Sequence, residues 1–149
     1  KQKTAYEIGV RLVGSEMCIR DSLYPLQKFD SDTERRFAII LERDALKWFK
    51  PARGQFQIYY ALGAEPSEYI PDFVAETAAT VLMVETKAKN DIATPDVQAK
   101  ATAALRWCKH ASDHAATIGA KSWKYLLVPD DEISESRCIT DFLRFEMKG

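Results

Sequence analysis

The sequence has few cysteines, no long apolar run and almost no net charge, and each of these shortages argues against a class of protein. Its three cysteines, Cys18, Cys108 and Cys138, are odd in number and lack the spacing of metal ligands. This pattern disfavours a disulfide-stabilised secreted protein and a zinc site, so we expect buried, inert thiols in a reducing, cytoplasmic setting. No stretch approaches the roughly 20 apolar residues that a membrane-spanning helix needs, so no membrane association is expected.

The overall charge does not indicate a particular class of binding partner. A formal net charge of −1 leaves no overall basic field of the kind that nucleic-acid-binding domains often carry. Any contact with nucleic acid must therefore come from a local patch, or from other parts of a larger protein. A length of 149 residues, of which 46% are hydrophobic, is enough for one domain with a substantial buried core.

The first 22 residues are set apart from the rest. Residues 17–22 read Met-Cys-Ile-Arg-Asp-Ser, which resembles the translation of a transposase-end adapter used in preparing sequencing libraries. We interpret residues 1–22 as a non-native leader, with a natural segment and a coincidental match as the alternative. Residues 23–149 then form the domain, which we expect to be a fragment of a larger protein.

The predicted elements follow the order α-β-β-β-α-β. Ser31 and Glu34 form a capping box for a helix that we expect to reach about residue 49, before Pro51 and Gly54. Apolar periodicity and β-favouring residues predict strands over residues 55–62, 69–76, 80–87 and 123–128, and further helices over residues 95–117 and 138–145. This order is typical of an α/β fold with a mixed central sheet flanked by helices.

Two carboxylates fall on neighbouring predicted strands. Asp72 lies in the segment Tyr-Ile-Pro-Asp-Phe, and Glu85 follows a continuously apolar run, with Lys87 two residues further on. Residues 77–79 leave room for little more than a hairpin turn, so both carboxylates should lie close together. Because side chains alternate along a strand, Glu85 and Lys87 should share one face.

This arrangement suits metal-assisted cleavage of a phosphodiester. Mg²⁺ takes oxygen ligands, commonly one or two carboxylates, and it polarises phosphoryl oxygens and lowers the pKa of bound water. We expect Asp72 and Glu85 to bind the metal, and the carbonyl of Thr86 can add a third ligand. Lys87 can orient the attacking water or stabilise developing negative charge. Glu34 can reach the metal directly or through water, although its capping role alone also explains it.

The same residues have plainer interpretations. Asp72 can cap a turn after Pro71, and Glu85 with Lys87 can form an exposed ion pair at a strand end. We favour a site, because a charge placed directly after four buried positions is costly without a purpose. Basic residues along the second helix, among them Lys100, are interpreted as a solvated face.

With their surroundings, these residues resemble the PD-(D/E)XK nuclease motif. Its two halves are matched by Ile-Pro-Asp, ending at Asp72, and by Glu-Thr-Lys over residues 85–87. The order α-β-β-β-α-β is similar to the restriction-endonuclease-like core of that superfamily. More narrowly, Phe-Asp-Ser-Asp-Thr-Glu over residues 29–34 and the later Trp-Cys and Trp-Lys-Tyr segments are similar to the C-terminal endonuclease domain of type III restriction enzymes. The likeness covers residues 29–145.

The resemblance implies a Mg²⁺-dependent endonuclease, or one using Mn²⁺, that hydrolyses double-stranded DNA in restriction-modification. Its catalytic residues would be Asp72, Glu85, Lys87 and Glu34, and its metal ligands the three carboxylates with Thr86. In that family the cutting protein also carries an ATP-driven helicase-like motor, and a methyltransferase subunit recognises the DNA sequence. This chain has no Gly-X-X-X-X-Gly-Lys-Ser/Thr phosphate loop, so ATP would act only through a motor outside it.

Two alternatives stay open. One is a different PD-(D/E)XK nuclease, of the repair or phage type. The other is an inactive nuclease-like module that serves for DNA binding or assembly.

Overall fold

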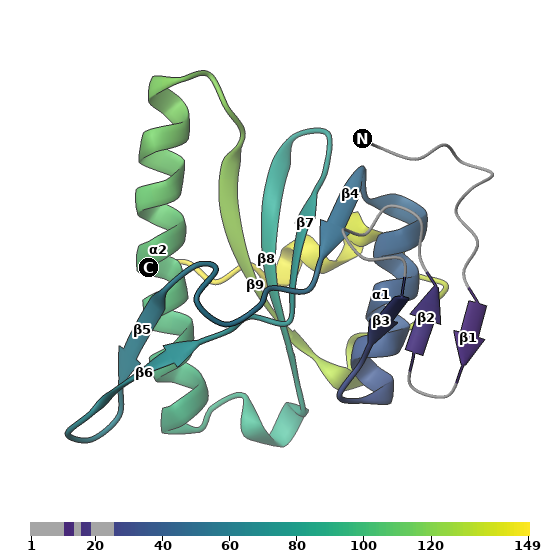
Figure 1. Ribbon diagram of the computed structural model, residues 1–149, viewed down its shortest axis with the longest axis horizontal. Helices are drawn as coiled ribbons and strands as arrows, with labels where there is room; N and C mark the ends of the chain where they lie inside the picture. Colours follow the sequence, from purple (N-terminus) through teal and green to yellow (C-terminus); the bar gives the residue numbers. More distant parts are fainter. Residues whose placement is uncertain (1–10, 14–15, 19–25) are drawn as a thin grey trace.

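A four-stranded mixed sheet forms the centre of the protein, and helices cover both of its faces (Figure 1). The computed structural model describes residues 11–13, 16–18 and 26–149. The sheet order is β4 (Lys47–Phe49), β7 (Phe73–Glu76), β8 (Thr80–Lys87) and β9 (Ser122–Pro129). Strand β7 is antiparallel to both β4 and β8, whereas β9 is parallel to β8. The predicted α/β class with a mixed sheet is therefore confirmed.

The two long helices lie on opposite faces of this sheet (Figure 1). Helix α1 (Asp32–Asp44) packs with Leu82 and Val84 of β8, whereas α2 (Pro95–Thr117) packs with Met83 between them. Successive side chains of a strand point to opposite faces, so the continuously apolar run in β8 supplies both cores. A 3₁₀ helix, η4 (Ile139–Phe145), adds Phe142 to the α1 side.

Helix α1 begins where the sequence predicts and ends earlier than predicted. The side chain of Ser31 accepts a hydrogen bond from the backbone N–H of Glu34 at 3.1 Å, which confirms the cap. The predicted extension to residue 49 is wrong, because the backbone is extended at Ala45 and residues 47–49 form β4. Trp48 is buried in the strand, and its Nε1 donates to Glu42 at 3.0 Å. Trp48 continues the apolar spacing of the helix in the sequence because it is buried, although it does not belong to the helix.

The predicted strand over residues 55–62 exists but does not join the central sheet. Strand β5 (Ile58–Ala61) pairs antiparallel with β6 (Pro66–Tyr69), and the two form a separate hairpin that lies beside α2 (Figure 1). The predicted strand over residues 69–76 is likewise divided into β6 and β7. Pro71 lies at the division, where its missing N–H cannot contribute to a ladder.

The remaining elements match the sequence-based expectations closely. Residues 77–79 make the tight turn between β7 and β8, where the N–H of Thr77 donates to the carbonyl of Thr80 at 2.8 Å. Helix α2 covers the predicted residues, and Gly119 after it has the left-handed φ of 67° that favours glycine. The loop before α2 contains the 3₁₀ turn η2 (Lys89–Asp91), and the loop after β9 contains η3 (Asp130–Glu132).

Three short strands precede this core. They are β1 (Arg11–Val13), β2 (Glu16–Cys18) and β3 (Leu26–Lys28), which form an antiparallel sheet in that order. Of the predicted leader, residues 1–10, 14–15 and 19–22 lie outside the described residues, as does most of the adapter-like segment. The interpretation of a non-native leader, and of a domain over residues 23–149, stays a prediction.

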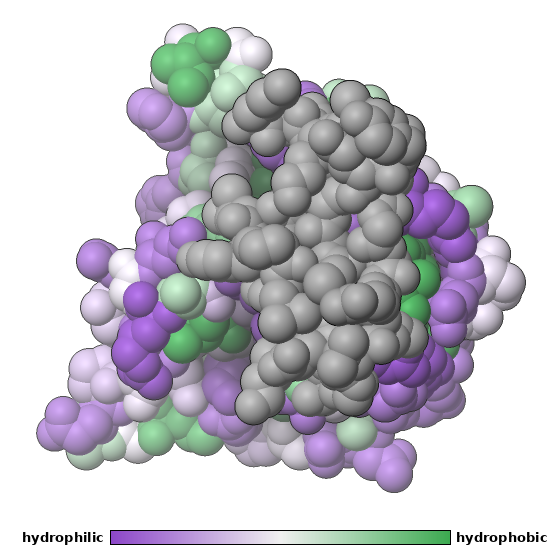
Figure 2. All heavy atoms as spheres, turned by 45° about the vertical axis from the view of Figure 1, so that its right-hand side comes forward, coloured by the Kyte–Doolittle hydropathy of each residue, from purple (hydrophilic) through white to green (hydrophobic). Residues whose placement is uncertain are grey.

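Figure 2 shows one face of the molecule, coloured by the hydropathy of its described residues. Its described apolar residues form separate small groups among hydrophilic ones. Exposed large apolar side chains include Tyr59 and Leu62 near the β5–β6 hairpin and Ile118 after α2. None of the helices in the described part of the chain is both long and apolar enough to cross a membrane.

The cysteines only partly match the expectation of buried thiols. Cys108 is buried in the α2 core, and burial raises the pKa of its thiol to about 12, so it is neutral and unreactive near pH 7. Cys138 is exposed, and for this residue the expectation is wrong.

Candidate active site

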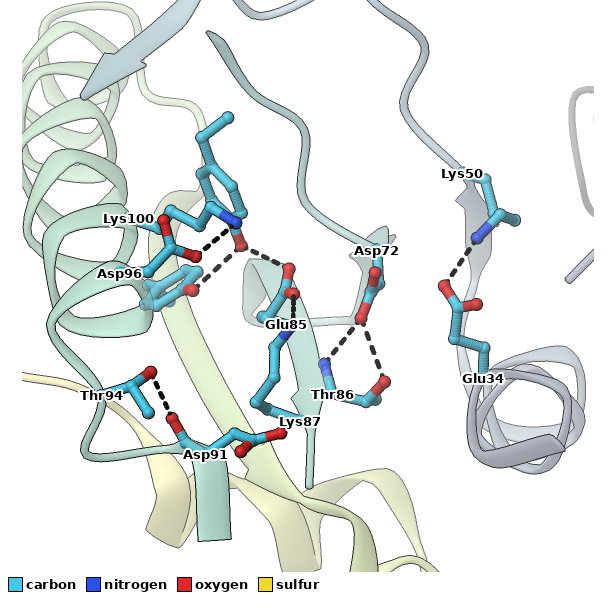
Figure 3. A network of polar contacts seen from close by, with 12 residues as sticks. Glu34, Lys50, Asp72, Glu85, Thr86, Lys87, Asp91, Thr94, Asp96 and Lys100 are labelled. Atoms are coloured by element: carbon cyan, nitrogen blue, oxygen red, sulfur yellow. Dashed lines mark hydrogen bonds and ion pairs between the residues drawn. The ribbon is translucent and has the colours of Figure 1, made fainter. Parts of the chain in front are cut away.

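The residues that the sequence singles out come together at one end of the central sheet (Figure 3). Asp72 lies between β6 and β7, and Glu85 and Lys87 lie near the end of β8. Because Phe73 pairs with Val84, Asp72 and Glu85 are the next residues on their two strands at the same end of the ladder. Glu34 reaches this end from the first turn of α1. The predicted closeness of Asp72 and Glu85 follows from the short turn at the other end of this hairpin.

Asp72 is held by hydrogen bonds from Thr86. Its Oδ2 accepts from the backbone N–H of Thr86 at 2.8 Å and from the Thr86 hydroxyl at 3.0 Å. Burial raises the pKa of Asp72 well above its usual range, and the negative charges of Glu85 and then Glu34 raise it further. Among the described residues no cation forms an ion pair with Asp72. This carboxylate is therefore the least compensated group of the site.

Glu85 is held from both sides. Its Oε1 accepts a hydrogen bond of 2.6 Å from the hydroxyl of Tyr69, which lies 3.0 Å from the hydroxyl of Tyr125. Its Oε2 lies 3.3 Å from Nζ of Lys87, which confirms that the two side chains share a face. Burial raises the pKa of Glu85, whereas the bond from Tyr69 and the charge of Lys87 oppose that rise. The plainer interpretation of an exposed pair is wrong for Glu85, which is only 7% exposed.

Glu34 serves as a cap and also faces the site. Its Oε2 accepts a hydrogen bond from the backbone N–H of Asp30 at 2.8 Å, and its Oε1 lies 3.0 Å from Nζ of Lys50. The return bond of the capping box thus reaches Asp30 and not Ser31. Since the charge of Glu34 also raises the pKa of Asp72, the two interpretations of Glu34 are compatible.

Three residues of this region were missed or misjudged from the sequence. Tyr69 and Lys50 had no recognised signal, because their side-chain contacts with Glu85 and Glu34 join separate segments of the chain. Lys100 was interpreted as part of a solvated face. It forms an ion pair of 2.9 Å with Asp96, yet it lies near Glu85, whose pKa its positive charge lowers (Figure 3).

The donor chemistry of the site suits a hard divalent cation. Asp72, Glu85 and Glu34 offer carboxylate oxygens, the ligands that Mg²⁺ prefers. In the present arrangement each is bonded to its own local donors, and no three His, Cys, Asp or Glu side chains in the described part of the chain are gathered tightly enough to hold an ion. Binding a metal would therefore exchange lysine contacts of Glu34 and Glu85 for the ion. That the Thr86 carbonyl adds a third ligand to the metal stays a prediction.

The chain matches no protein-family model, and a comparison with curated protein sequences also finds no match. Its functional interpretation therefore depends on the site and on the motif that the sequence carries.

Proposed function

We propose that this domain is a Mg²⁺-dependent PD-(D/E)XK endonuclease that hydrolyses double-stranded DNA, with Mn²⁺ able to replace Mg²⁺. The observation that carries the proposal is that Asp72, Glu85, Glu34 and Lys87 all lie at the same end of β8. Burial and the negative charges of Glu85 and Glu34 all raise the pKa of Asp72, and such an arrangement is costly to the fold. Such a cluster is typical of a functional site that a bound cation would complete.

Each residue has a role in this scheme. Asp72 and Glu85, with Glu34, hold the cation, which when bound supplies polarisation of the phosphoryl oxygen and an activated water. Lys87 presents a positive charge beside Glu85, where it orients the attacking water or stabilises charge that develops on the phosphate. Thr86 and Tyr69 orient the carboxylates of Asp72 and Glu85 through their hydrogen bonds.

The order of elements supports the same proposal. With the β5–β6 hairpin taken as an insertion, the central elements follow the order α1-β4-β7-β8-α2-β9. This is similar to the α-β-β-β-α-β core of the nuclease superfamily, with β4 in the place that residues 55–62 were predicted to fill. In the fuller proposal the domain is the cleavage part of a cytoplasmic type III restriction enzyme, whose motor and methyltransferase partner lie outside this chain.

The test is cleavage of duplex DNA by the purified chain with Mg²⁺, assayed beside the Asp72→Ala and Lys87→Ala variants. Each substitution should abolish cutting while circular dichroism shows an intact fold. Lys47→Ala is the matched control, because Lys47 is exposed and pairs with Glu76 at the other end of the hairpin. Undiminished cutting by either site variant would reject the proposal. Blunt, nicked and branched substrates then separate a restriction enzyme from a repair or phage-type nuclease.

One observation favours the inactive module as a second candidate. Glu34 and Glu85 already have lysine partners in Lys50 and Lys87, so the site is partly neutralised without a metal. Calorimetry with Mg²⁺ or Mn²⁺ separates the candidates. Binding that Asp72→Ala removes supports the nuclease, and no binding at millimolar metal supports the inactive module.

A further inference from the structure

We propose that Lys50 is an internal counterion that competes with the divalent cation for Glu34 and so sets the metal affinity of the site. This inference rests on the proposed function. It concerns a residue outside the PD-(D/E)XK motif. The observation behind it is an ion pair of 3.0 Å between Nζ of Lys50 and Oε1 of Glu34, in which both side chains are largely withdrawn from water.

The position of Lys50 is well defined by its surroundings. It follows β4 directly and precedes Pro51, whose ring restricts the backbone there. Its ammonium group lies 5.1 Å from the centre of the Phe73 ring and 5.6 Å from that of Phe29. Two aromatic faces and one carboxylate thus hold the charge in place, and only 19% of the side chain is exposed.

Both oxygens of the Glu34 carboxylate already have partners. Its Oε2 is engaged by the N–H of Asp30, which belongs to the cap of α1. Its Oε1 is the oxygen that Lys50 occupies. With Oε2 already accepting from Asp30, we expect a cation shared by Asp72 and Glu34 to use Oε1, so ion and ammonium would compete for the same atom. Two positive charges a few ångströms apart also repel each other strongly in a site of low dielectric.

A competing Lys50 and a purely structural Lys50 predict opposite changes in metal affinity when the lysine charge is removed. If Lys50 only packs against the aromatic rings and holds Glu34 in place, removing its charge loosens the site and weakens metal binding. If Lys50 competes, removing its charge leaves Glu34 free for the ion and strengthens metal binding. The sign of the change in affinity therefore separates the two roles.

The experiment is a calorimetric titration of the whole chain with Mn²⁺, in the absence of DNA. Lys50→Met, which keeps the apolar stem and removes the charge, should bind Mn²⁺ about tenfold more tightly than the unaltered chain, a change within the usual range of coupling between sites. Lys50→Arg keeps the charge and should bind within about twofold of the unaltered chain. Lys47→Met, at the start of β4 and paired with Glu76, is the matched control and should change nothing.

The outcomes are decisive. Tighter binding by Lys50→Met alone supports the proposal, and unchanged or weaker binding overturns it while leaving the nuclease proposal intact. If the unaltered chain binds no Mn²⁺, the proposed function fails, and this inference fails with it. Should Lys50→Met not fold, as judged by circular dichroism, Lys50→Gln takes its place in the same comparison.

Discussion

The β7–β8 hairpin carries acidic side chains at both ends, and the two ends differ in how those charges are balanced. At the turn end, Glu76 bonds to Lys121 at 2.6 Å and lies 3.2 Å from Lys47, and these contacts lower its pKa. At the open end, burial raises the pKa of both Asp72 and Glu85, and the negative charges of Glu85 and Glu34 raise that of Asp72 further. The turn end thus stabilises the charged form of its carboxylate, whereas at the open end the charged forms of the carboxylates destabilise the fold.

We interpret this difference as one between an acid that stabilises the fold and the acids of the proposed site. Glu76 has two lysine partners and partial access to water, so its charge favours the folded state. Asp72 and Glu85 crowd one another with fewer cations between them, an arrangement that costs stability and persists where a ligand makes use of it. The comparison can be tested on matched residues of a single hairpin.

The largest expected effect is on cleavage. Glu85→Ala should lower the rate of Mg²⁺-dependent cutting of duplex DNA about 1,000-fold, the order seen when an active-site electrostatic group is removed. Glu76→Ala should leave the rate within about twofold, since Glu76 lies at the far end of the strands. Single-turnover assays at saturating Mg²⁺ measure both. Equal losses in the two variants would contradict the distinction between the ends.

The next effect is a gain in stability. Asp72→Asn removes an uncompensated charge and keeps an oxygen for the Thr86 hydrogen bonds, so the free energy of unfolding at pH 7 should rise by about 1 kcal/mol. Because the pKa of Asp72 is raised on folding, its stabilising contribution is complete below the unfolded value of about 4 and is lost as pH increases through the folded value. The advantage of the variant should therefore widen from low to neutral pH.

Urea denaturation without divalent cations, repeated across that pH interval, measures this advantage. Asp113→Asn is the control, because Asp113 is exposed on α2 and pairs with Lys109. A variant at position 72 that is less stable at every pH would show that the Asp72 charge supports the fold.

The smallest expected effect is at the turn end. Glu76→Gln should lower the free energy of unfolding by about 0.5 kcal/mol, as is usual for ion pairs with access to water. Since the pKa of Glu76 is lowered on folding, its contribution is present above the unfolded value of about 4 and disappears as pH falls through the folded value. Thermal melts at low and high salt check this, because screening should reduce the difference. A loss of stability that does not depend on salt would show that Glu76 stabilises the fold through packing and not through its ion pairs.

Sequence reasoning succeeded where signals are local and long. Helix α2 and strands β8 and β9 are long and carry consistent apolar patterns, so their positions follow almost directly from the sequence. The short turn at residues 77–79 likewise predicts the pairing of β7 with β8. Sequence reasoning failed for β4, a strand of three residues that exists because β7 pairs with it. It also placed residues 55–62 in the central sheet, since β-favouring composition does not specify a partner.

The candidate site divides in the same way. Asp72, Glu85 and Lys87 could be grouped in advance, because one tight hairpin and strand alternation bring them together. Tyr69 and Lys50 could not be grouped with them, because their contacts depend on the break at Pro71 and on the place of β4 at the sheet edge. Lys100 was assigned to a solvated face because Glu85, whose pKa its charge lowers, belongs to another element.

By itself the sequence determined the α/β class, the cap of α1, the apolar core strand and the acid, acid and lysine motif, because all of these depend on neighbours within a few residues. Only the tertiary structure decided which strands form the central sheet, which carboxylates are paired with lysines and which stay uncompensated. Those properties depend on burial and on charges brought together from distant segments, and a local pattern contains neither.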